Sequence, residues 1–396
     1  MANVTHTSRN GARTSRAALV AIAIAAGLGA CGTAAGEGAQ QTPAPPINAA
    51  AQQAQSAEAP AVAPPPPALP SGCPDPSAWS NLQLAQFAVV PGFEGDGGWP
   101  SWLGAGPAGA FVPHGSAGFA RGDIADRVPE SPRPFIAVDY EGGQVMDLAG
   151  LIGVAPSARE QARTMSPEQV RALANDRGGA MRHYGITVDF APVLDLDLGS
   201  PIVGDRSYSS NPEVVAAYAT AWAQGLHDGG VIPVLKHFPG HGSARGDSHK
   251  GLVVTDAWDV LRNRDVPVYA EVLKNSGPAM VMMGHLVVPG LSTDPESPTS
   301  VDPQAYRALR DTTGFTGPVI TDDLAAMKAI TDRLSIPQAV ISAVHAGADL
   351  ALITEAASYP DSVQALASWA DSNPGYRQQL INSALRVLPL TPCATG

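Results

Sequence analysis

Short apolar runs alternate with helical patterns through residues 73–393, and this alternation narrows the possible folds of the chain considerably. The runs have the length of strands, and most are continuously apolar, as is typical of strands buried on both faces. Eight of them are predicted as strands: Leu84–Val90, Gly109–Val112, Phe135–Val138, Ile186–Phe190, Ile232–Leu235, Met280–Met283, Pro318–Thr321 and Leu350–Ile353. Eight strand–helix repeats predict one α/β domain over residues 73–396, a (β/α)8 barrel.

The helices between the runs carry their own start and stop signals. Val214–His227 is amphipathic, and it is preceded by Asn211-Pro212 and followed by Gly229-Gly230, which are typical of helix starts and ends. A second amphipathic helix is predicted over Pro337–His345. A doubly wound open sheet is the alternative architecture. No glycine-rich dinucleotide fingerprint follows the first run, so the barrel is favoured.

The charge balance limits the classes of partner. The formal net charge is −12, because 36 Asp and Glu residues outnumber 24 Lys and Arg residues. A nucleic-acid-binding protein normally presents a basic face, so this balance argues against a nucleic-acid partner and favours a neutral or small-molecule ligand. Hydrophobic residues make up 44% of the chain, which is enough for a sizeable core. We expect a monomer that needs no cofactor.

The first 31 residues have the pattern of an export signal. A positive region is formed by Arg9, Arg13 and Arg16. The apolar segment Ala17–Gly29 follows and is shorter than the roughly 20 residues that a membrane-spanning helix needs. It ends in Leu28-Gly29-Ala30-Cys31, which resembles a bacterial lipobox. We therefore predict a signal peptide over residues 1–30 and a lipid anchor on Cys31, with the protein exported to the outer face of the cytoplasmic membrane. The alternative is a plain secretory signal with a chance cysteine.

Residues 32–72 consist mainly of Ala, Gln, Pro, Gly and Ser, and they include Pro64–Pro67. Such a segment cannot bury enough apolar surface to fold, so a disordered, partly polyproline tether is predicted. Two cysteines remain besides the anchor, Cys73 and Cys393, at the two ends of the folded region. In an exported chain this pair favours a disulfide, and two free thiols are the alternative.

Polar side chains gather directly after the predicted strands, where the active sites of (β/α)8 barrels lie. These positions are Asp139-Tyr140-Glu141-Gly142-Gly143, Asp195, Lys236-His237-Phe238-Pro239-Gly240-His241-Gly242, His285 and Asp322-Asp323. Asp322 and Asp323 leave a buried strand, and a carboxylate there can act as a nucleophile or a general base. Alternatively, an Asp at this point caps the next helix. Adjacent strand residues point to opposite sides, so we expect one to be catalytic and one structural.

Asp247-Ser248-His249 lies in a loop rich in glycine and serine. Asp247 and His249 can meet if the backbone is extended, since residues i and i+2 then face the same side. A carboxylate raises the basicity of an imidazole and orients it. This pattern predicts His249 as a proton shuttle on a mobile loop, with a solvated loop histidine as the alternative.

Three histidines, His237, His241 and His249, also invite a metal interpretation. A spacing of four would place His237 and His241 on one face of a helix. Pro239-Gly240 lies between them, however, and disfavours a helix there. We therefore expect no metal ligands in this segment.

Two cations, Lys236 and Arg206, also lie in the segments that follow strands. They could hold sugar hydroxyl groups and orient a nucleophile, or they could be ordinary surface charges. An aspartate nucleophile with a separate acid/base is the chemistry of retaining glycoside hydrolysis. The usual acid/base is a second carboxylic acid, whereas here it would be a histidine.

Four blocks of the sequence carry a family resemblance. They are Lys236-His237-Phe238-Pro239-Gly240-His241-Gly242 followed after four residues by Asp247-Ser248-His249, then Phe190-Ala191-Pro192-Val193-Leu194-Asp195, Gly204-Asp205-Arg206-Ser207-Tyr208 and Thr321-Asp322-Asp323-Leu324. Over roughly residues 80–390 the chain resembles glycoside hydrolase family 3, in its single-domain β-N-acetylglucosaminidase branch. The first block is highly specific.

This resemblance implies a (β/α)8 barrel and a retaining two-step mechanism. It makes Asp322 the nucleophile, and His249, paired with Asp247, the acid/base. It also implies a set of residues that hold the sugar: Asp139, Arg206, Lys236 and His237, with Asp195 supporting the cationic residues. The implied substrate is terminal β-linked N-acetylglucosamine on peptidoglycan fragments (muropeptides).

One block departs from the family. Asp139-Tyr140-Glu141-Gly142-Gly143-Gln144-Val145 stands where the family has Asp-Gln-Glu-Gly-Gly-Arg-Val, so Gln144 replaces a cation. This change bears on the loop and the preferred aglycone, not on the nucleophile or the Asp-His pair. The alternative functions are a β-glycosidase or phosphorylase of other specificity, a metal-dependent hydrolase, and a lipid-anchored sugar-binding protein without activity.

Overall fold

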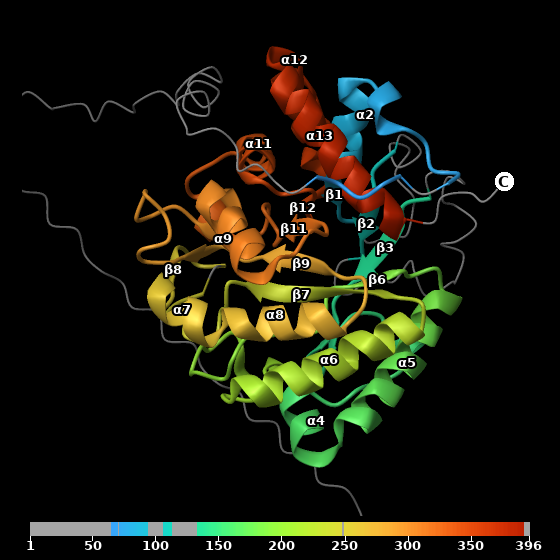
Figure 1. Ribbon diagram of the computed structural model, residues 1–396, viewed down its shortest axis with the longest axis vertical. Coiled ribbons are helices and arrows are strands. Elements are labelled where there is room, and N and C mark those ends of the chain that lie inside the picture. The colour runs from blue at the N-terminus through green and yellow to red at the C-terminus, as the bar shows by residue number, and fades with distance from the viewer. Residues whose placement is uncertain (1–64, 70, 94–105, 113–132, 248, 392–396) are drawn as a thin grey trace, which may run out of the picture. The chain divides into compact units, whose positions relative to one another are not determined.

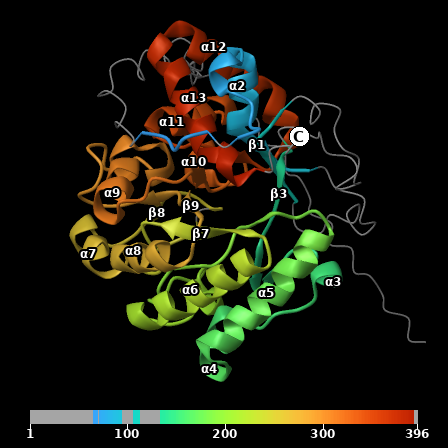
Figure 2. The same ribbon diagram turned by 45° about the vertical axis from the view of Figure 1, so that its right-hand side comes forward.

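The computed structural model describes residues 65–69, 71–93, 106–112, 133–247 and 249–391. Short parallel strands lie at the centre of the folded region, and helices surround them (Figure 1; Figure 2). Eight of these strands follow one another around the centre: β1 (Val89–Pro91), β2 (Gly109–Phe111), β3 (Phe135–Val138), β6 (Val188–Asp189), β7 (Ile232–Phe238), β9 (Met280–Met283), β11 (Val319–Thr321) and β12 (Ala351–Ile353).

Backbone pairing closes these strands into a ring. Six form a sheet in the order β11-β9-β7-β6-β3-β2, and β1 pairs in parallel with β12. Two single bridges join the groups, because Gly92 pairs with Phe111 of β2 and Ile320 of β11 pairs with Leu350 beside β12. Each strand therefore lies next to its sequence neighbour in the ring, as in a (β/α)8 barrel, and the predicted fold class is confirmed.

The first predicted strand, Leu84–Val90, is wrong over most of its length. Residues Asn81–Ala88 form helix α2, and the strand begins only at Val89. Ser80 and Gln83 form a capping box that starts the helix. The buried side chains are Leu84, Ala85, Phe87 and Ala88, a spacing of one helix face. A short apolar run does not distinguish a buried strand from a buried helix.

The remaining elements surround or decorate the barrel. The α-helices of the described residues, besides α2, are α3 (Ala149–Ile152), α4 (Ala158–Thr164), α5 (Pro167–His183), α6 (Pro212–Asp228), α7 (Trp258–Arg264), α8 (Val266–Asn275), α9 (Pro303–Thr313), α10 (Lys328–Thr331), α11 (Ile336–Ala346), α12 (Tyr359–Ser372) and α13 (Pro374–Val387). The predicted helices Val214–His227 and Pro337–His345 are confirmed as α6 and α11. Two small ladders complete the fold: antiparallel β4 (Tyr140–Gly142) with β5 (Val145–Met146), and parallel β8 (Val253–Val254) with β10 (Leu286–Val287).

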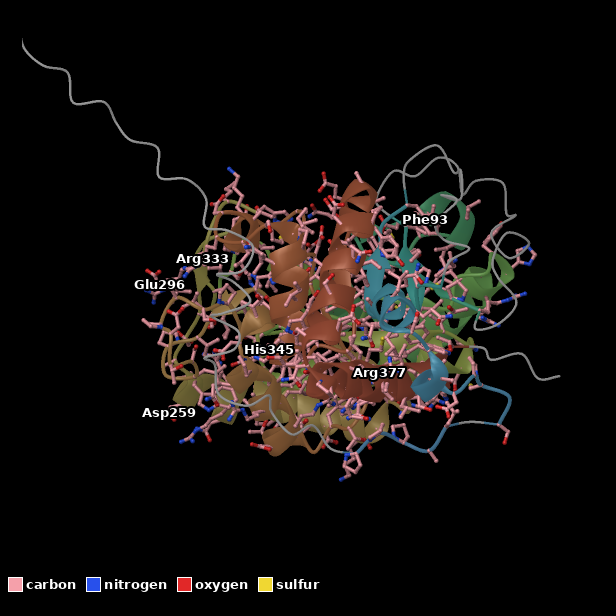
Figure 3. The ribbon with its side chains drawn as sticks, turned by 90° about the horizontal axis from the view of Figure 1, so that it is seen from above. Phe93, Asp259, Glu296, Arg333, His345 and Arg377 are labelled. Carbon is pink, nitrogen blue, oxygen red and sulfur yellow. The ribbon has the colours of Figure 1, made fainter. Side chains whose placement is uncertain are left out.

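Elements from the two ends of the described chain pack against each other. Helix α2 lies beside α12 and α13 (Figure 1). The guanidinium of Arg377 in α13 donates to Asn81 Oδ1 at 2.6 Å and to the carbonyls of Ser77 and Trp79 at 3.0 and 2.8 Å (Figure 3). These contacts hold the first strand in place beside the last, where the ring closes.

Several predictions fall on residues outside the described ranges. Cys31, Cys393 and the predicted signal peptide are among them. Cys73 is described and is disulfide-bonded, while its pairing with Cys393 remains a prediction. Leu69, near the end of the predicted tether, packs against the main core. Within the described ranges, none of the helices combines the length and apolar character needed to cross a membrane.

Candidate active site

A cavity of about 330 Å³ opens at the carboxyl ends of the barrel strands. The polar side chains that line it come from distant parts of the chain: Asp139, Glu141, Arg206, Lys236, His237, His241, His249, Asp322 and Asp323. Aromatic and aliphatic side chains, including the stacked pair Phe111 and Phe190, form the rest of its wall. A larger hollow of about 740 Å³ lies between α6 and α8, and none of the predicted site residues lines it. The chemistry predicted from the sequence therefore converges on the first cavity.

Asp322 and Asp323, at the end of β11, have separate roles. The Asp323 carboxylate accepts the backbone N–H groups of Ala325 and Thr354 at 2.9 and 3.0 Å and that of Ala326 at 3.2 Å. It also accepts the Thr354 hydroxyl. Asp323 thus ties β11 to the segment after β12. The Asp322 carboxylate accepts the N–H of Asp323 at 2.8 Å, and its side chain lines the cavity.

The surroundings of Asp322 hold its carboxyl ionised. Burial by itself would raise the pKa of this group, but His237, His285 and Lys236 nearby outweigh burial and lower the pKa to about 2. His285, which follows β9, is itself fixed, since its Nε2 lies 3.0 Å from the Asp323 carbonyl oxygen. An ionised carboxylate in a buried cavity is the state that a nucleophile requires.

Two cations and two carboxylates form one network in the cavity. Lys236 in β7 contacts both Asp139 and Glu141, with Nζ 2.6 Å from Glu141 Oε1. The Arg206 guanidinium binds Glu141 through two hydrogen bonds of 2.7 Å each, a bidentate arrangement. Burial opposes ionisation of Glu141, yet the two cations lower its pKa to about 2. Lys236 and Arg206 are therefore both charged and both fixed in place.

Glu141 is the site residue that the sequence interpretation missed. It was part of the Asp139–Gly143 block but was not assigned a role. Asp139 and Glu141 lie two residues apart on an extended segment, where side chains i and i+2 face the same side. The alternation of side chains along this extended segment is the signal that could have identified Glu141 as a site residue.

Asp195 contacts His237 directly, and it acts on Arg206 only through its charge. Its Oδ2 lies 2.7 Å from His237 Nδ1, and its Oδ1 accepts the backbone N–H of His241 at 2.6 Å. Burial tends to raise the pKa of Asp195, but His237 and these hydrogen bonds lower it. The carboxylate thereby orients the His237 ring. The direct ion pairs of Lys236 and Arg206 are made with Glu141 and Asp139, while the charge of Asp195 also favours the ionised form of Arg206.

His241 is buried beside His237, with ring centroids 5.8 Å apart. Burial lowers its pKa, so the ring is neutral near pH 7. His237 lies in strand β7, so no helix aligns the two histidines. In the described part of the chain, no group of three or more His, Cys, Asp or Glu side chains is arranged to hold a metal ion.

Asp247 and His249 are paired, as their spacing predicts. Asp247 Oδ1 lies 3.0 Å from His249 Nδ1 and accepts the backbone N–H of His249 at 3.0 Å. His249 borders the cavity, yet 56% of its side chain is exposed. Lys250 also binds the other Asp247 oxygen, at 3.1 Å. The pair thus lies at the open edge of the cavity.

The two departures in the Asp139–Val145 block point away from the cavity centre. The Tyr140 hydroxyl donates to the Gly153 carbonyl at 2.6 Å, and neither Tyr140 nor Gln144 lines the cavity. The exposed Gln144 amide lies 3.5 Å from Asp205 Oδ1, next to Arg206 in the chain. Neither substitution touches Asp322 or the Asp247–His249 pair.

The chain matches known proteins of one family. The model of the glycosyl hydrolase family 3 N-terminal domain matches residues 123–390. Beta-hexosaminidase LpqI of Mycobacterium tuberculosis is 50% identical over 225 residues, which are 55% of this chain and 57% of that relative. A beta-hexosaminidase of Xylella fastidiosa is 33% identical over 249 residues, which are 60% of this chain and 72% of the relative.

Solved structures agree with these sequence matches. The structure of M. tuberculosis LpqI aligns with a TM-score of 0.74 and 37% identity, covering 83% of this chain and 98% of that one. A family 3 glycosyl hydrolase of Mycobacterium smegmatis aligns with a TM-score of 0.73 and 39% identity, covering 79% of this chain and 99% of the other. The match to the first curated relative spans little more than half of that protein's length. The family match covers most of the chain, which therefore belongs to glycosyl hydrolase family 3.

Proposed function

We propose that this protein is a retaining exo-β-N-acetylglucosaminidase that removes terminal N-acetylglucosamine from peptidoglycan fragments. One observation carries the proposal: the ionised Asp322, the Asp247–His249 pair and the cations around Glu141 meet at a single cavity. Two relatives of the chain are named beta-hexosaminidases, which supports this sugar specificity.

The proposed reaction has two steps. In the first, an Asp322 oxygen attacks the anomeric carbon, the bond from this carbon to the leaving-group oxygen breaks, and protonated His249 gives its proton to that oxygen. In the second, neutral His249 takes a proton from water. The water oxygen then bonds to the anomeric carbon while the bond to Asp322 breaks. Asp247 stabilises the imidazolium form of His249, which is present before the first step and again after the second.

The network of cations and carboxylates is suited to sugar hydroxyl groups. Asp139 can accept hydrogen bonds from hydroxyls, while Lys236 and Arg206 can donate to them. The cavity lies at the small end of the volumes typical of ligand pockets, so it suits one terminal sugar better than the middle of a polymer. This argues for exo cleavage.

We also propose that the enzyme is an envelope lipoprotein, exported and anchored through Cys31. The pattern of the first 31 residues is the basis for this assignment. Labelled palmitate should be incorporated into the full chain and not into Cys31→Ala. Equal incorporation by both would reject the anchor and leave the enzymatic proposal intact.

The enzymatic proposal is tested with paired nitrophenyl β-glycosides. We expect a strong preference for the N-acetylglucosaminide over the glucoside. Asp322→Asn should reduce kcat by about 10³-fold or more while N-acetylglucosamine still binds, because a neutral amide cannot form the glycosyl-enzyme. A folded wild-type protein without activity on either sugar would instead support the sugar-binding alternative.

His249 is tested through the dependence on the leaving group. His249→Ala should lose more activity on a disaccharide or muropeptide than on a nitrophenyl glycoside, since only the poorer leaving groups need a proton. Equal losses on both substrates would remove His249 from the acid/base role. Product formation with and without phosphate separates hydrolysis from phosphorolysis.

A further inference from the structure

We propose that Asp189, the last residue of β6, is a positioning residue of the sugar site. It holds the Tyr140 amide so that the carboxylates on either side of it, Asp139 and Glu141, both face the cavity. This inference rests on the proposed function, because it concerns how the side chains that bind the sugar are held.

Asp189 contacts the sugar-site segment directly from the neighbouring strand. It is fully buried, and its Oδ1 accepts the Tyr140 N–H at 2.9 Å. The preceding amide, that of Asp139, donates to Asp147 Oδ2 at 3.2 Å. Two successive backbone amides are therefore bound by buried side-chain carboxyls at the point where the chain leaves β3.

These two bonds set the direction of the side chains. Tyr140 turns away from the cavity, and its hydroxyl donates to Gly153. The residues on either side of Tyr140 face the opposite way, into the cavity, where they meet Lys236. A shift of the Tyr140 amide would therefore move Asp139 and Glu141 together.

Asp189 is buried close to the charged network but outside its ion pairs. The ion pairs of Lys236 and Arg206 are made with Asp139 and Glu141. Burial raises the pKa of Asp189 well above its usual range, although the Tyr140 amide and Lys236 act in the opposite direction. The second oxygen of Asp189 is buried and has no hydrogen-bond partner among the described residues.

Asparagine keeps the accepting oxygen and cannot carry a charge, whereas alanine removes the acceptor. In the full-length protein, Asp189→Asn should therefore bind N-acetylglucosamine nearly as wild type does. Asp189→Ala leaves the Tyr140 N–H unsatisfied, so its Kd for N-acetylglucosamine and its KM should rise roughly tenfold or more. Asp189→Leu, which keeps the volume without the acceptor, gives the same comparison if the alanine variant is unstable.

Thr187→Val is the matched control. Thr187, directly before β6 and two residues before Asp189 in the chain, makes the same kind of bond, because its Oγ1 accepts the N–H of Ile136 in β3 at 3.2 Å. This variant should lower the melting temperature without changing Kd. If Asp189 positions the sugar site, Asp189→Ala should raise Kd and Thr187→Val should not. If both residues are only structural, both variants should lower the melting temperature and leave Kd unchanged.

Four outcomes distinguish the possibilities. Wild-type binding by Asp189→Ala or Asp189→Leu would overturn the inference, and so would a tenfold loss in Asp189→Asn, which would make the charge rather than the acceptor important. Restored binding in Asp189→Asn with loss in the other two supports it. If the wild-type protein neither binds nor hydrolyses the sugar, the proposed function fails instead.

Discussion

Glu141 illustrates how much one buried side chain can organise. Its two oxygens bind Arg206 and Lys236, and its side chain is 2% exposed. The cations come from different segments of the barrel, so this carboxylate sets their distance from each other. Removing one partner of a buried ion pair leaves the other charge uncompensated. This destabilises the protein more than replacing both partners by apolar side chains does.

Glu141→Gln should therefore impair both stability and sugar binding. We expect a destabilisation of about 3 kcal/mol and a kcat/KM reduced by about two orders of magnitude, because Arg206 loses its counter-charge and Lys236 keeps only Asp139. Thermal unfolding and steady-state kinetics measure the two effects. The control is Glu160→Gln, which breaks the exposed pair of Glu160 with Arg163 and should change neither quantity. Wild-type kinetics in Glu141→Gln would show that the cations do not need this carboxylate.

Asp265 is a buried carboxyl outside the network of Lys236, Arg206 and Glu141. Its Oδ2 accepts Arg264 Nε at 2.8 Å, while its Oδ1 has no hydrogen-bond partner among the described residues. Burial raises its pKa to about 6, although Arg264 acts to lower it. Between about pH 4 and pH 6 the folded protein therefore keeps a proton that the unfolded chain has lost, so this group makes stability fall as pH rises.

Asp265→Asn should remove this fall in stability. Relative to wild type, the variant should gain stability as the pH rises from 4 to 7, by up to about 3 kcal/mol for a shift of this size. Melting temperatures across this pH range measure the difference. Asp259→Asn removes one exposed surface charge (Figure 3) and should show no such trend. A difference in melting temperature between Asp265→Asn and wild type that does not change with pH would contradict the raised pKa of Asp265.

Helices α5 and α6 pack side by side along the outside of the barrel (Figure 2). Their close approach depends on Gly225 in α6. A Cβ at this position would lie 2.3 Å from the Arg171 carbonyl oxygen and 2.6 Å from the Ala174 Cβ. These neighbours belong to the backbone and a methyl group of α5, so they cannot move aside without shifting that helix.

Gly225→Ala should destabilise the protein by about 1–3 kcal/mol through overpacking, despite the better helix propensity of alanine. Gly179 in α5 provides the matched control, because a Cβ there meets nothing within 4 Å. Gly179→Ala should be neutral or stabilise by up to about 1 kcal/mol. Chemical denaturation of both variants tests the pair. Equal changes in the free energy of unfolding for the two variants would show that the close packing of α5 against α6 at Gly225 does not determine stability.

The ring of strands joins the beginning and the end of the folded region, since β1 pairs with β12. A disulfide between Cys73 and Cys393 would reinforce this closure. Its removal should destabilise the protein by about 2–5 kcal/mol, mainly because the unfolded chain gains freedom. Cys73→Ser, Cys393→Ser and the double variant should then lose the same amount of stability. Additive losses, or both thiols free in non-reducing peptide mapping, would reject this pairing.

The repeat of apolar runs and helical patterns was enough to predict the barrel and seven of its eight strands in place. Burial on both faces leaves a local signature that each strand carries in its own residues. The pairing of Asp247 with His249 could also be predicted, since it depends on a spacing of two residues in one loop. The site was predicted largely from the rule that functional side chains follow the strands.

Contacts between distant segments decided the rest. The run Leu84–Val90 is a helix over most of its length because its apolar side chains bury one helix face, which a short run does not reveal in advance. Strand position alone does not distinguish Asp322 from Asp323, whereas the bonds that Asp323 accepts from Thr354, Ala325 and Ala326 give it a structural role. Glu141 becomes important because the barrel brings Lys236 and Arg206 to it. Such roles depend on distances between segments, and a linear pattern does not contain them.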